Sequence, residues 1–506
     1  MSSNLIDEVS LYLQEYNDTL VNWHRWNKKA LTIARNEKKP IFLSIGYSGS
    51  LLCKRMKNDS FNDKEIAKIL NENFISIKVD KDERVDIDKY YKQVYRLMNG
   101  QNGSSPLSIF MSENLEPFYS VAYIPKNTMG NLIGFKELLE IIIDKYKNDK
   151  LTLIKKGKEI LSHLNYKNNK IKATKFNKNI IDTLDKHFHE LFDNQYGGFG
   201  NMPKFLNISL IDLMFEYYRV SGNRDILEKA LFTLRKIAKG EIYDSNRGGF
   251  YRYANEKNWN RPRLEKIGLD NGNIAYLYIK AYKITKDSFF QQIALKTIDF
   301  MLKEMSKDSL FFSNLVENQD GSIFKDTKVI TSSNAMIIDT IFSASTIDNS
   351  YLSTAIKHID RVLDEYYING ELYHTKNIKA FLEDYAYLGV ALLKAYKITD
   401  NQEYLIISQT LLNRAIERFY EYGRWRFSIG DIEVYDDIYD LSYPSSISTI
   451  LYLIEKISPL IEGDYRDILF KTLEMHSYNL MRQPLSSPKM TKVLLLYLEH
   501  GIILEN

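Results

Sequence analysis

The hexapeptide Lys280-Ala-Tyr-Lys-Ile-Thr returns letter for letter as Lys394-Ala-Tyr-Lys-Ile-Thr, and each copy closes a segment with helical spacing of apolar residues. A short polar turn and a second helical pattern follow each copy. Turn residues recur at intervals of 52 to 64 residues, at Asn223, Asp287, Asp348 and Asp400. This repeat predicts helical hairpins, which bury their apolar faces only by stacking on neighbouring hairpins.

Loops rich in glycine and aromatic residues separate the predicted hairpins. They read Tyr196-Gly-Gly-Phe-Gly, Arg247-Gly-Gly-Phe-Tyr-Arg-Tyr and Tyr422-Gly-Arg-Trp-Arg-Phe, and a sixth hairpin is predicted around residues 446–474. In a closed ring of hairpins these loops would gather at one end, and such positioned loops commonly carry function. We therefore expect them to line a cleft.

The first 150 residues carry a different pattern, which predicts mixed α/β structure. Pro40-Ile-Phe-Leu-Ser-Ile reads as a buried strand, and Asn73-Phe-Ile-Ser-Ile-Lys-Val-Asp alternates with period two. Between them, residues 63–70 have helical spacing with Asp63 as the expected N-cap. A third strand is predicted to open at Pro106. Strand, helix and strand in this order indicate a βαβ unit with a parallel pair.

Composition limits the function classes. The chain has 506 residues and a net charge of +3 with both signs interspersed, so we expect no nucleic-acid partner. No apolar run reaches the length of a membrane span, the start lacks a signal-peptide pattern, and Cys53 is the single cysteine. These features predict a cytoplasmic protein without an intramolecular disulfide. The 36 tyrosines either reflect compositional bias or line a groove for polar ligands.

Several motifs, in the same order, resemble the spermatogenesis-associated protein 20 family. They include Asn22-Trp-His-Arg-Trp, Lys39-Pro-Ile-Phe-Leu-Ser-Ile-Gly-Tyr-Ser, Gly197-Gly-Phe-Gly-Asn-Met-Pro-Lys-Phe and Phe381-Leu-Glu-Asp-Tyr-Ala. The resemblance implies an α/β thioredoxin-like domain over residues 1–165. An all-α (α/α)6 toroid over residues 166–506 is expected to follow, similar to six-hairpin glycosidases and N-acylglucosamine 2-epimerases.

The thioredoxin-like motif departs from the family at its reactive position. Where the family has a Cys-His-Trp-Cys-His pattern, this chain has Ser50-Leu-Leu-Cys53-Lys. The attacking thiolate position therefore holds Ser50, which has no redox couple, so this site cannot cycle between dithiol and disulfide. We expect Ser50 to cap a helix and Pro106 to be the cis-proline facing the site. Cys53 is interpreted either as a sensor thiol or as a small buried hydrophobe.

In the toroid, the resemblance indicates three candidate catalytic carboxylates, Glu265, Asp270 and Asp384. A pair of carboxylates across a funnel can act as acid and base on a glycosidic bond. Further candidates for ligand binding are Arg252, Tyr253, Trp259, Lys266, Asn271 and Glu383. The alternative is that these side chains cap helices and bind arginine or backbone N–H groups in the crowded loops.

Other positions differ from the family in chemistry-bearing residues. Ser245, Tyr251 and Arg263 stand where the family tends to have histidine, the usual proton-transfer group near neutral pH. This pattern indicates a retained fold with lost chemistry. The two histidines at 187 and 189 lack clustered acids or cysteines, so neither a metal nor another cofactor is expected.

Three functions follow from these observations. The first is a protein that binds a small polar ligand, such as a sugar, in the toroid and acts in carbohydrate metabolism. The second is a sugar-processing glycosidase or epimerase using Glu265, Asp270 and Asp384. The third is a single-thiol redox sensor acting through Cys53. The sequence leaves the oligomeric state open.

Overall fold

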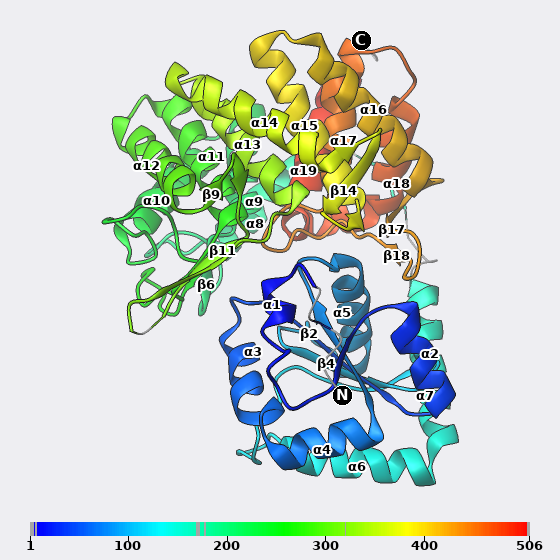
Figure 1. Ribbon diagram of the computed structural model, residues 1–506. Coiled ribbons are helices and arrows are strands. Elements are labelled where there is room, and N and C mark those ends of the chain that lie inside the picture. Colours follow the sequence, from blue (N-terminus) through cyan, green and yellow to red (C-terminus); the bar gives the residue numbers. More distant parts are fainter. Residues whose placement is uncertain (1–4, 6–7, 168–172, 177–178, 319, 503–506) are drawn as a thin grey trace. The chain divides into compact units, whose positions relative to one another are not determined.

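A computed structural model describes residues 5, 8–167, 173–176, 179–318 and 320–502, and it divides the chain into two compact units, Met1–Ile171 and Lys172–Asn506 (Figure 1). The sequence predicted domains of 1–165 and 166–506. The expectation about a signal peptide rests in part on residues 1–4, which lie outside the described residues. Among the described residues, no helix combines the length and hydropathy needed to cross a bilayer.

The first unit is built on a five-stranded sheet with the order β1-β3-β2-β4-β5. The strands are β1 (Trp23–Arg25), β2 (Ile41–Gly46), β3 (Ile75–Asp80), β4 (Leu107–Met111) and β5 (Pro117–Val121). β3 pairs in parallel with β1 and β2, whereas β4 is antiparallel to β2 and β5. The predicted parallel βαβ pair is therefore confirmed, as is the strand after Pro106.

Helices cover this sheet, and α1 to α4 begin at side chains that cap them. They are α1 (Leu11–Gln14), α2 (Lys28–Glu37), α3 (Leu51–Arg55), the π-helical η1 (Met56–Phe61), α4 (Lys64–Asn73), α5 (Val85–Asn99), α6 (Phe135–Asn148) and α7 (Lys150–Lys167). The Asp63 carboxylate accepts the N–H groups of Glu65 and Ile66, which confirms the predicted N-cap of α4. An aromatic core of Trp23, Phe42 and Phe61 fills one face.

The second unit is a ring of paired helices (Figure 1). Its described helices are α8 (Ile180–Leu191), α9 (Ile208–Ser221), α10 (Arg224–Lys239), α11 (Gly268–Thr285), α12 (Ser288–Glu304), α13 (Thr331–Ser345), α14 (Leu352–Tyr366), α15 (Leu382–Thr399), α16 (Gln402–Phe419), α17 (Ser446–Ile457), α18 (Arg466–Arg482) and α19 (Pro488–Ile502), with 3-10 turns η2 (Asn349–Tyr351), η3 (Ser458–Leu460) and η4 (Pro484–Ser486). Each copy of the repeated hexapeptide ends a helix, α11 and α15, as predicted.

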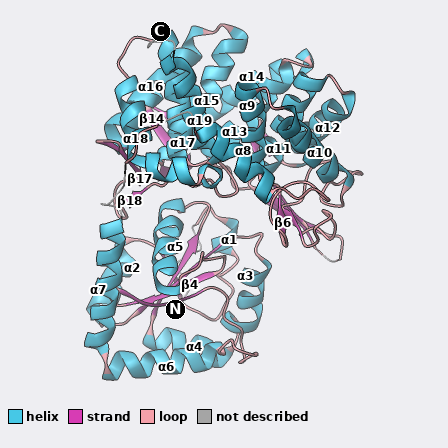
Figure 2. Ribbon diagram, turned by 180° about the vertical axis from the view of Figure 1, so that it is seen from behind, coloured by secondary structure: helices cyan, strands magenta, loops and turns pink. Residues whose placement is uncertain are grey.

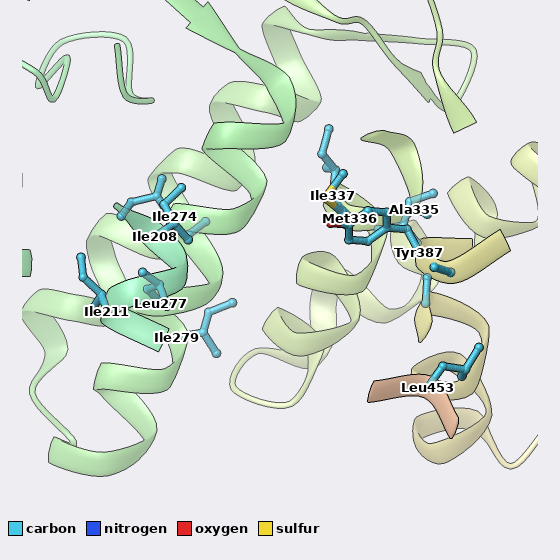
Figure 3. Packing of buried hydrophobic residues seen from close by; sticks show 14 of the residues in the cluster. Ile208, Ile211, Ile274, Leu277, Ile279, Ala335, Met336, Ile337, Tyr387 and Leu453 are labelled. Carbon is cyan, nitrogen blue, oxygen red and sulfur yellow. The ribbon is translucent and has the colours of Figure 1, made fainter. Parts of the chain in front are cut away.

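The inner helices close the ring. Within the described residues, α9, α11, α13, α15, α17 and α19 pack each on the next, and α19 returns to α9. The intervening helices lie outside, with α10 on α9, α12 on α11, α14 on α13, α16 on α15 and α18 on α17. This is the predicted (α/α)6 toroid. Its apolar core includes residues of neighbouring inner helices, such as Ile274 of α11 and Ile337 of α13, or Tyr387 of α15 and Leu453 of α17 (Figure 3).

Long connections carry α8, α10, α12, α14 and α16 to the next inner helix, so they collect at the N-terminal end of the inner ring. They contain short antiparallel strands (Figure 2). The strands are β6 (Lys204–Phe205), β7 (Tyr253–Ala254), β8 (Glu265–Ile267), β9 (Ser306–Lys307), β10 (Leu310–Phe311), β11 (Asn314–Glu317), β12 (Ile323–Asp326), β13 (Tyr367–Ile368), β14 (Glu371–Thr375), β15 (Ile378–Lys379), β16 (Tyr420–Glu421), β17 (Arg424–Ser428) and β18 (Val434–Tyr435). The glycine- and aromatic-rich loops thus gather at one end of the toroid.

Candidate functional site

The thioredoxin-like motif lies at the end of β2. Ser50 is the N-cap of α3, and its Oγ accepts the N–H of Cys53 at 3.2 Å, as predicted. The same hydroxyl donates to the carbonyl of Ser105 at 3.3 Å, and the Ser105–Pro106 peptide bond is cis, also as predicted. The helix-capping Ser50 and the cis-proline Pro106 therefore lie next to each other, as the corresponding positions of a thioredoxin fold do.

Cys53 lies behind this surface. Its side chain is only 1% exposed and belongs to the aromatic core, and a side chain at Gly46 would collide with it. The Tyr16 hydroxyl donates to the Cys53 carbonyl at 3.3 Å. A thiol in this position is reached from solvent only when the core opens, which disfavours a sensor role.

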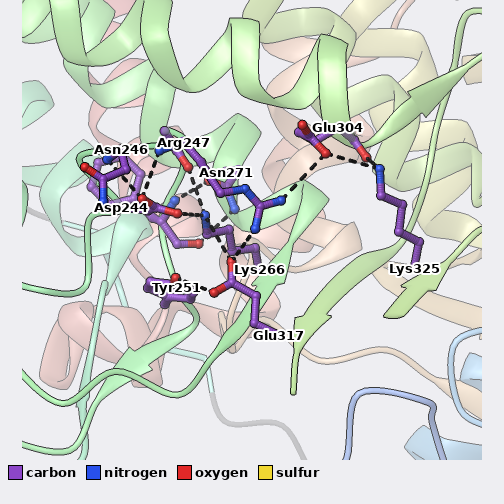
Figure 4. Close-up of polar contacts among 11 residues, drawn as sticks. Asp244, Asn246, Arg247, Tyr251, Lys266, Asn271, Glu304, Glu317 and Lys325 are labelled. Atoms are coloured by element: carbon purple, nitrogen blue, oxygen red, sulfur yellow. Dashed lines mark hydrogen bonds and ion pairs between the residues drawn. The ribbon is translucent and has the colours of Figure 1, made fainter. Parts of the chain in front are cut away.

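In the second unit, the predicted ligand residue Lys266 lies in a cluster of ion pairs with Asp244 and Glu317 (Figure 4). The Lys266 ammonium is fully buried and lies 2.6 Å from the Asp244 carboxylate, and it donates to the Gly248 carbonyl at 3.0 Å. Glu317 bridges this cluster, because it accepts hydrogen bonds from Arg247 and Tyr251 at 2.9 Å each. The Lys266 ammonium thus holds the loops together, and ligand binding by Lys266 stays a prediction.

The two aromatic candidates, Trp259 and Tyr253, pack against other residues of the loops. Trp259 is 0% exposed, its indole N–H donates to the Tyr196 carbonyl at 2.8 Å, and a side chain at Gly198 or Gly240 would collide with it. The prediction that Trp259 stacks on a sugar is therefore wrong, because no face of the ring is open. Tyr253 is half-buried in β7, where its ring lies 5.1 Å from that of Phe205.

Asn271 fixes a loop instead of facing a ligand. Its amide oxygen accepts the N–H of Phe250 at 2.6 Å, and its amide group donates to the carbonyls of Phe250 and Ile267. Asn334, at the equivalent fourth position of α13, bonds in the same way to Phe311 and Ile330. A side chain that completes three backbone hydrogen bonds is a structural pin, which corrects the prediction for Asn271.

The carboxylates near α15 form a second buried cluster. Asp384 is fully buried and accepts the backbone N–H groups of Ser332 at 3.0 Å and Phe381 at 2.9 Å, while His374 Nδ1 lies 2.9 Å from its oxygens. Glu383 accepts from the hydroxyls of Ser332 and Tyr443 at 3.2 and 3.3 Å. Asp384 therefore joins two helix N-termini, and its oxygens are occupied by the protein.

The remaining candidates lie at the loop end of the ring. Glu265 is buried in β8, and its carboxylate lies 3.2 Å from the guanidinium of Arg252. Asp270 lies in the first turn of α11 and is also buried. Within the described residues, none of the nine predicted toroid site residues lines the cavity at the centre of the ring.

That cavity, of about 100 Å³, is the strongest candidate site in the described part of the toroid. It is lined from all six inner helices and one loop by Ile208, Ser209, Asp212, Asn273, Tyr276, Leu277, Met336, Asp339, Thr340, Tyr387, Val390, Lys394, Pro444, Thr449, Tyr452, Lys489 and Lys492. We call it the axial cavity. Most of these residues fall in the first three turns of their helices, so the cavity occupies the N-terminal half of the ring.

Ion pairs connect neighbouring inner helices around the axial cavity. Asp212 of α9 pairs with Lys280 of α11 and, at 2.7 Å, with Lys492 of α19. Lys394 of α15 pairs at 2.7 Å with Asp339 of α13. Burial works to raise the pKa of Asp212, but the charges of Lys280, Lys492 and the nearby Lys489 outweigh it and hold that pKa well below its ordinary range.

Sequence reasoning missed the axial residues although a signal was present. Lys280 and Lys394 are the first letters of the repeated hexapeptide, and both side chains point toward the ring axis, where each pairs with an aspartate. A charged residue that recurs on the apolar face of a helix marks a buried ion pair or a site. The repeat predicts the hairpins, and its lysines, Lys280 and Lys394, indicate where ion pairs form near the centre of the ring.

Comparison with known proteins agrees with this architecture. Residues 2–165 match a family model named Thioredox_DsbH and described as a protein of unknown function, DUF255. Two solved structures share the fold of the second unit at a TM-score of 0.50 and 11% identity. A sugar epimerase from a ruminal bacterium covers 60% of this chain and 85% of its own, and cellobiose 2-epimerase from Spirochaeta thermophila DSM 6192 covers 64% and 96%.

Among proteins of known sequence, spermatogenesis-associated protein 20 of Rattus norvegicus is 32% identical over 321 residues, which are 61% of this chain. The same protein of Homo sapiens is 31% identical over 320 residues. The matched region spans 40% of the length of each of these curated relatives. The chain is thus similar to part of spermatogenesis-associated protein 20, and it joins a thioredoxin-like domain to an (α/α)6 toroid.

Proposed function

We propose that the protein binds a small polar ligand of the sugar class at the axial cavity, which holds part of the ligand, and that it acts in carbohydrate metabolism. The observation that carries this proposal is the lining of the cavity, where Tyr276, Tyr387 and Tyr452 come from three different inner helices. Burial raises the pKa of all three, so at neutral pH each hydroxyl stays protonated. Tyrosine offers an apolar ring and a polar tip, the combination that suits a sugar.

Binding is favoured over catalysis by the state of the candidate carboxylates. Glu265 pairs with Arg252, and Asp384 accepts two backbone N–H groups beside His374. A general acid or base needs a free path to the reacting atoms, and these groups are committed to helix ends and loops. The two epimerases of the same fold support the sugar class of ligand.

The thioredoxin-like unit is proposed to act without dithiol exchange. Ser50 occupies the attacking position and caps α3, and the chain contains one cysteine. Catalysis by thiol–disulfide exchange within one molecule needs two sulfurs. The single buried cysteine also supports the cytoplasmic location proposed for the chain.

The ligand proposal predicts stabilisation of the full chain by monosaccharides. A sugar that binds only the folded state should raise the unfolding temperature, and at about 100 Kd the gain is roughly 2.7 kcal/mol. Asn273→Ala and Tyr452→Phe each remove polar contacts from the lining, so binding by either variant should weaken roughly 3- to 10-fold. Titration calorimetry with the full chain measures the affinities.

The control for this experiment is Gln292→Ala, at an exposed position on outer helix α12, which should bind sugar as the wild type does. NMR spectra of the sugar, recorded during incubation, separate binding from catalysis. A product that disappears in Glu265→Gln or Asp270→Asn would favour the enzyme alternative. If no monosaccharide binds, or if both cavity variants bind normally, the sugar proposal fails.

Cys53 should react slowly in the native protein. Because its side chain is 1% exposed, modification by a thiol reagent requires local opening, and we expect a rate at least about tenfold below that of free cysteine at neutral pH. Denaturant should restore the full rate. Measured reaction faster than that of free cysteine in the folded chain would instead support the sensor alternative.

A further inference from the structure

Lysines are concentrated around the axial cavity. Lys394, Lys489 and Lys492 line it, and Lys280 contacts the lining residue Asp212. Four ammonium groups at the centre of a helical ring are costly unless each has an anionic partner or is neutral. The partners of these four lysines therefore decide whether the cavity has charge left for a ligand.

Three of the four lysines have carboxylate partners. Lys280 and Lys492 share Asp212, and Lys492 also lies 3.7 Å from Glu216. Lys394 has Asp339 and the Ser343 hydroxyl, each at 2.7 Å. These three ammonium groups are thus neutralised by the ring itself.

Lys489 is the exception. Within the described residues, no hydrogen-bond acceptor or carboxylate lies within bonding distance of its ammonium, which rests 3.8 Å from the centre of the Tyr452 ring. The nearby acidic side chain of Asp440 uses its two oxygens for the backbone N–H groups of Ser445 and Lys489 at 2.9 and 2.8 Å. An ammonium group that faces a cavity without an acceptor has capacity for an anion.

The position of Lys489 in its helix also favours an anion beside it. Lys489 lies in the first turn of α19 and Lys492 in the second, near the positive end of the helix dipole, where a further positive charge is unfavourable. Burial and the nearby Lys492 ammonium lower the pKa of Lys489 to about 8, against the opposing effect of the Asp212, Asp339 and Asp440 charges, so most molecules carry the charge at neutral pH. An anion beside this turn would offset both the dipole and the two lysines.

Cavity size limits what can enter. The volume of about 100 Å³ is smaller than the ~150 Å³ of a cavity that accepts benzene, so a charged head group fits and a complete sugar ring does not. The sugar part of such a ligand would then lie toward the N-termini of the inner helices. Asp270, Ser332 and Glu383 precede the lining residues there by about one helical turn.

We propose that the axial cavity binds the anionic group of its ligand, a carboxylate or a phosphate, through the ammonium of Lys489, with the hydroxyl of Tyr452 beside it. This inference rests on the proposed function and narrows its ligand class to acidic or phosphorylated sugars. Lys489 suits this role because its loss leaves no carboxylate unpaired.

The test compares four probes on the full chain by titration calorimetry: glucose, glucuronate, glucose 6-phosphate and inorganic phosphate. We expect an anionic sugar to bind more tightly than glucose. Lys489→Met should weaken binding of the anionic probes roughly 10- to 100-fold, the factor expected for loss of a charged hydrogen bond, and leave glucose binding unchanged. Lys489→Arg should retain most of the anion affinity.

Lys303→Met is the matched control, because it removes an exposed lysine from outer helix α12 and should leave all affinities unchanged. The preferred anionic sugar identifies whether the group is a carboxylate or a phosphate. If glucose binds and Lys489→Met binds the anions normally, the anion site is refuted and the sugar proposal stands. If phosphate alone binds and depends on Lys489, the anion site stands and the sugar proposal falls. Absence of all binding refutes both.

Discussion

Replacing Asp212 with alanine should lower the free energy of unfolding of the toroid by about 3–5 kcal/mol, because it leaves two buried ammonium groups without their shared partner. Lys492 lies 2.7 Å from Asp212, and Lys280 pairs with the same carboxylate from α11. These three residues join α9, α11 and α19, so losing the carboxylate weakens the contact between α9 and α19 that closes the ring. The chain has two units, so hydrogen exchange of peptides from these helices is a better measure than one melting temperature.

Asp339→Ala is the matched comparison on the opposite side of the ring. It leaves one lysine, Lys394, which keeps the Ser343 hydroxyl at 2.7 Å, so the expected loss is smaller. The triple variant Asp212→Leu, Lys280→Met, Lys492→Met should recover most of the stability that Asp212→Ala loses. Removing one partner leaves buried charges unpaired, whereas replacing all three charged residues by apolar ones leaves none. A loss below about 1 kcal/mol in Asp212→Ala would show that water reaches these charges and that the ring does not depend on them.

The fold was predictable because local and global signals agree in both units. Two strand patterns on either side of a capped helix predicted that β2 and β3 pair in parallel, with α4 between them in the chain. The aspartate at position 63 alone predicted the N-cap of α4. In the toroid, the repeated hexapeptide marked the ends of α11 and α15. Ring closure between α9 and α19 was expected only from the family resemblance, because contacts between distant segments leave no local pattern.

The site was harder to predict because polar residues in loops and on inner helices serve different purposes. Sequence reasoning chose residues from the glycine-rich loops, where Lys266, Trp259 and Asn271 instead hold the loops together. The axial cavity draws two or three side chains from each inner helix, and single residues such as Asp212 carry no motif. Only a three-dimensional arrangement shows that they converge.

Lys78 gives the second large expected effect, in the thioredoxin-like unit. Its side chain is 1% exposed, and its ammonium donates to Ser44 Oγ at 2.9 Å. The centres of the Tyr16 and Trp23 rings lie 3.9 and 5.1 Å from the ammonium. Cation–π contacts of about 0.5–2 kcal/mol oppose a desolvation penalty of several kcal/mol. Desolvation prevails, and burial lowers the pKa of Lys78 to about 7.

The pH dependence follows from this shift. The ordinary pKa of 10.5 applies in the unfolded chain, so between pH 7 and 10.5 the unfolded state binds more protons than the folded state. Stability of the first unit should therefore rise with pH above 7, by up to about 1.4 kcal/mol per pH unit from this group. Lys78→Met should remove that rise and stabilise the unit at pH 7 by a few kcal/mol, less about 1 kcal/mol for the Ser44 hydroxyl left without its donor.

The measurement is hydrogen exchange of peptides from β2 and β3 between pH 6 and 9, with the intrinsic exchange rate corrected at each pH. Lys68→Met, at an exposed position on α4, removes the same charge from the surface and should keep the wild-type slope. Equal slopes in Lys78→Met and wild type would mean that Lys78 is not the titrating group. A wild-type stability that falls between pH 7 and 9 would mean that the aromatic rings hold the ammonium more strongly than burial opposes it.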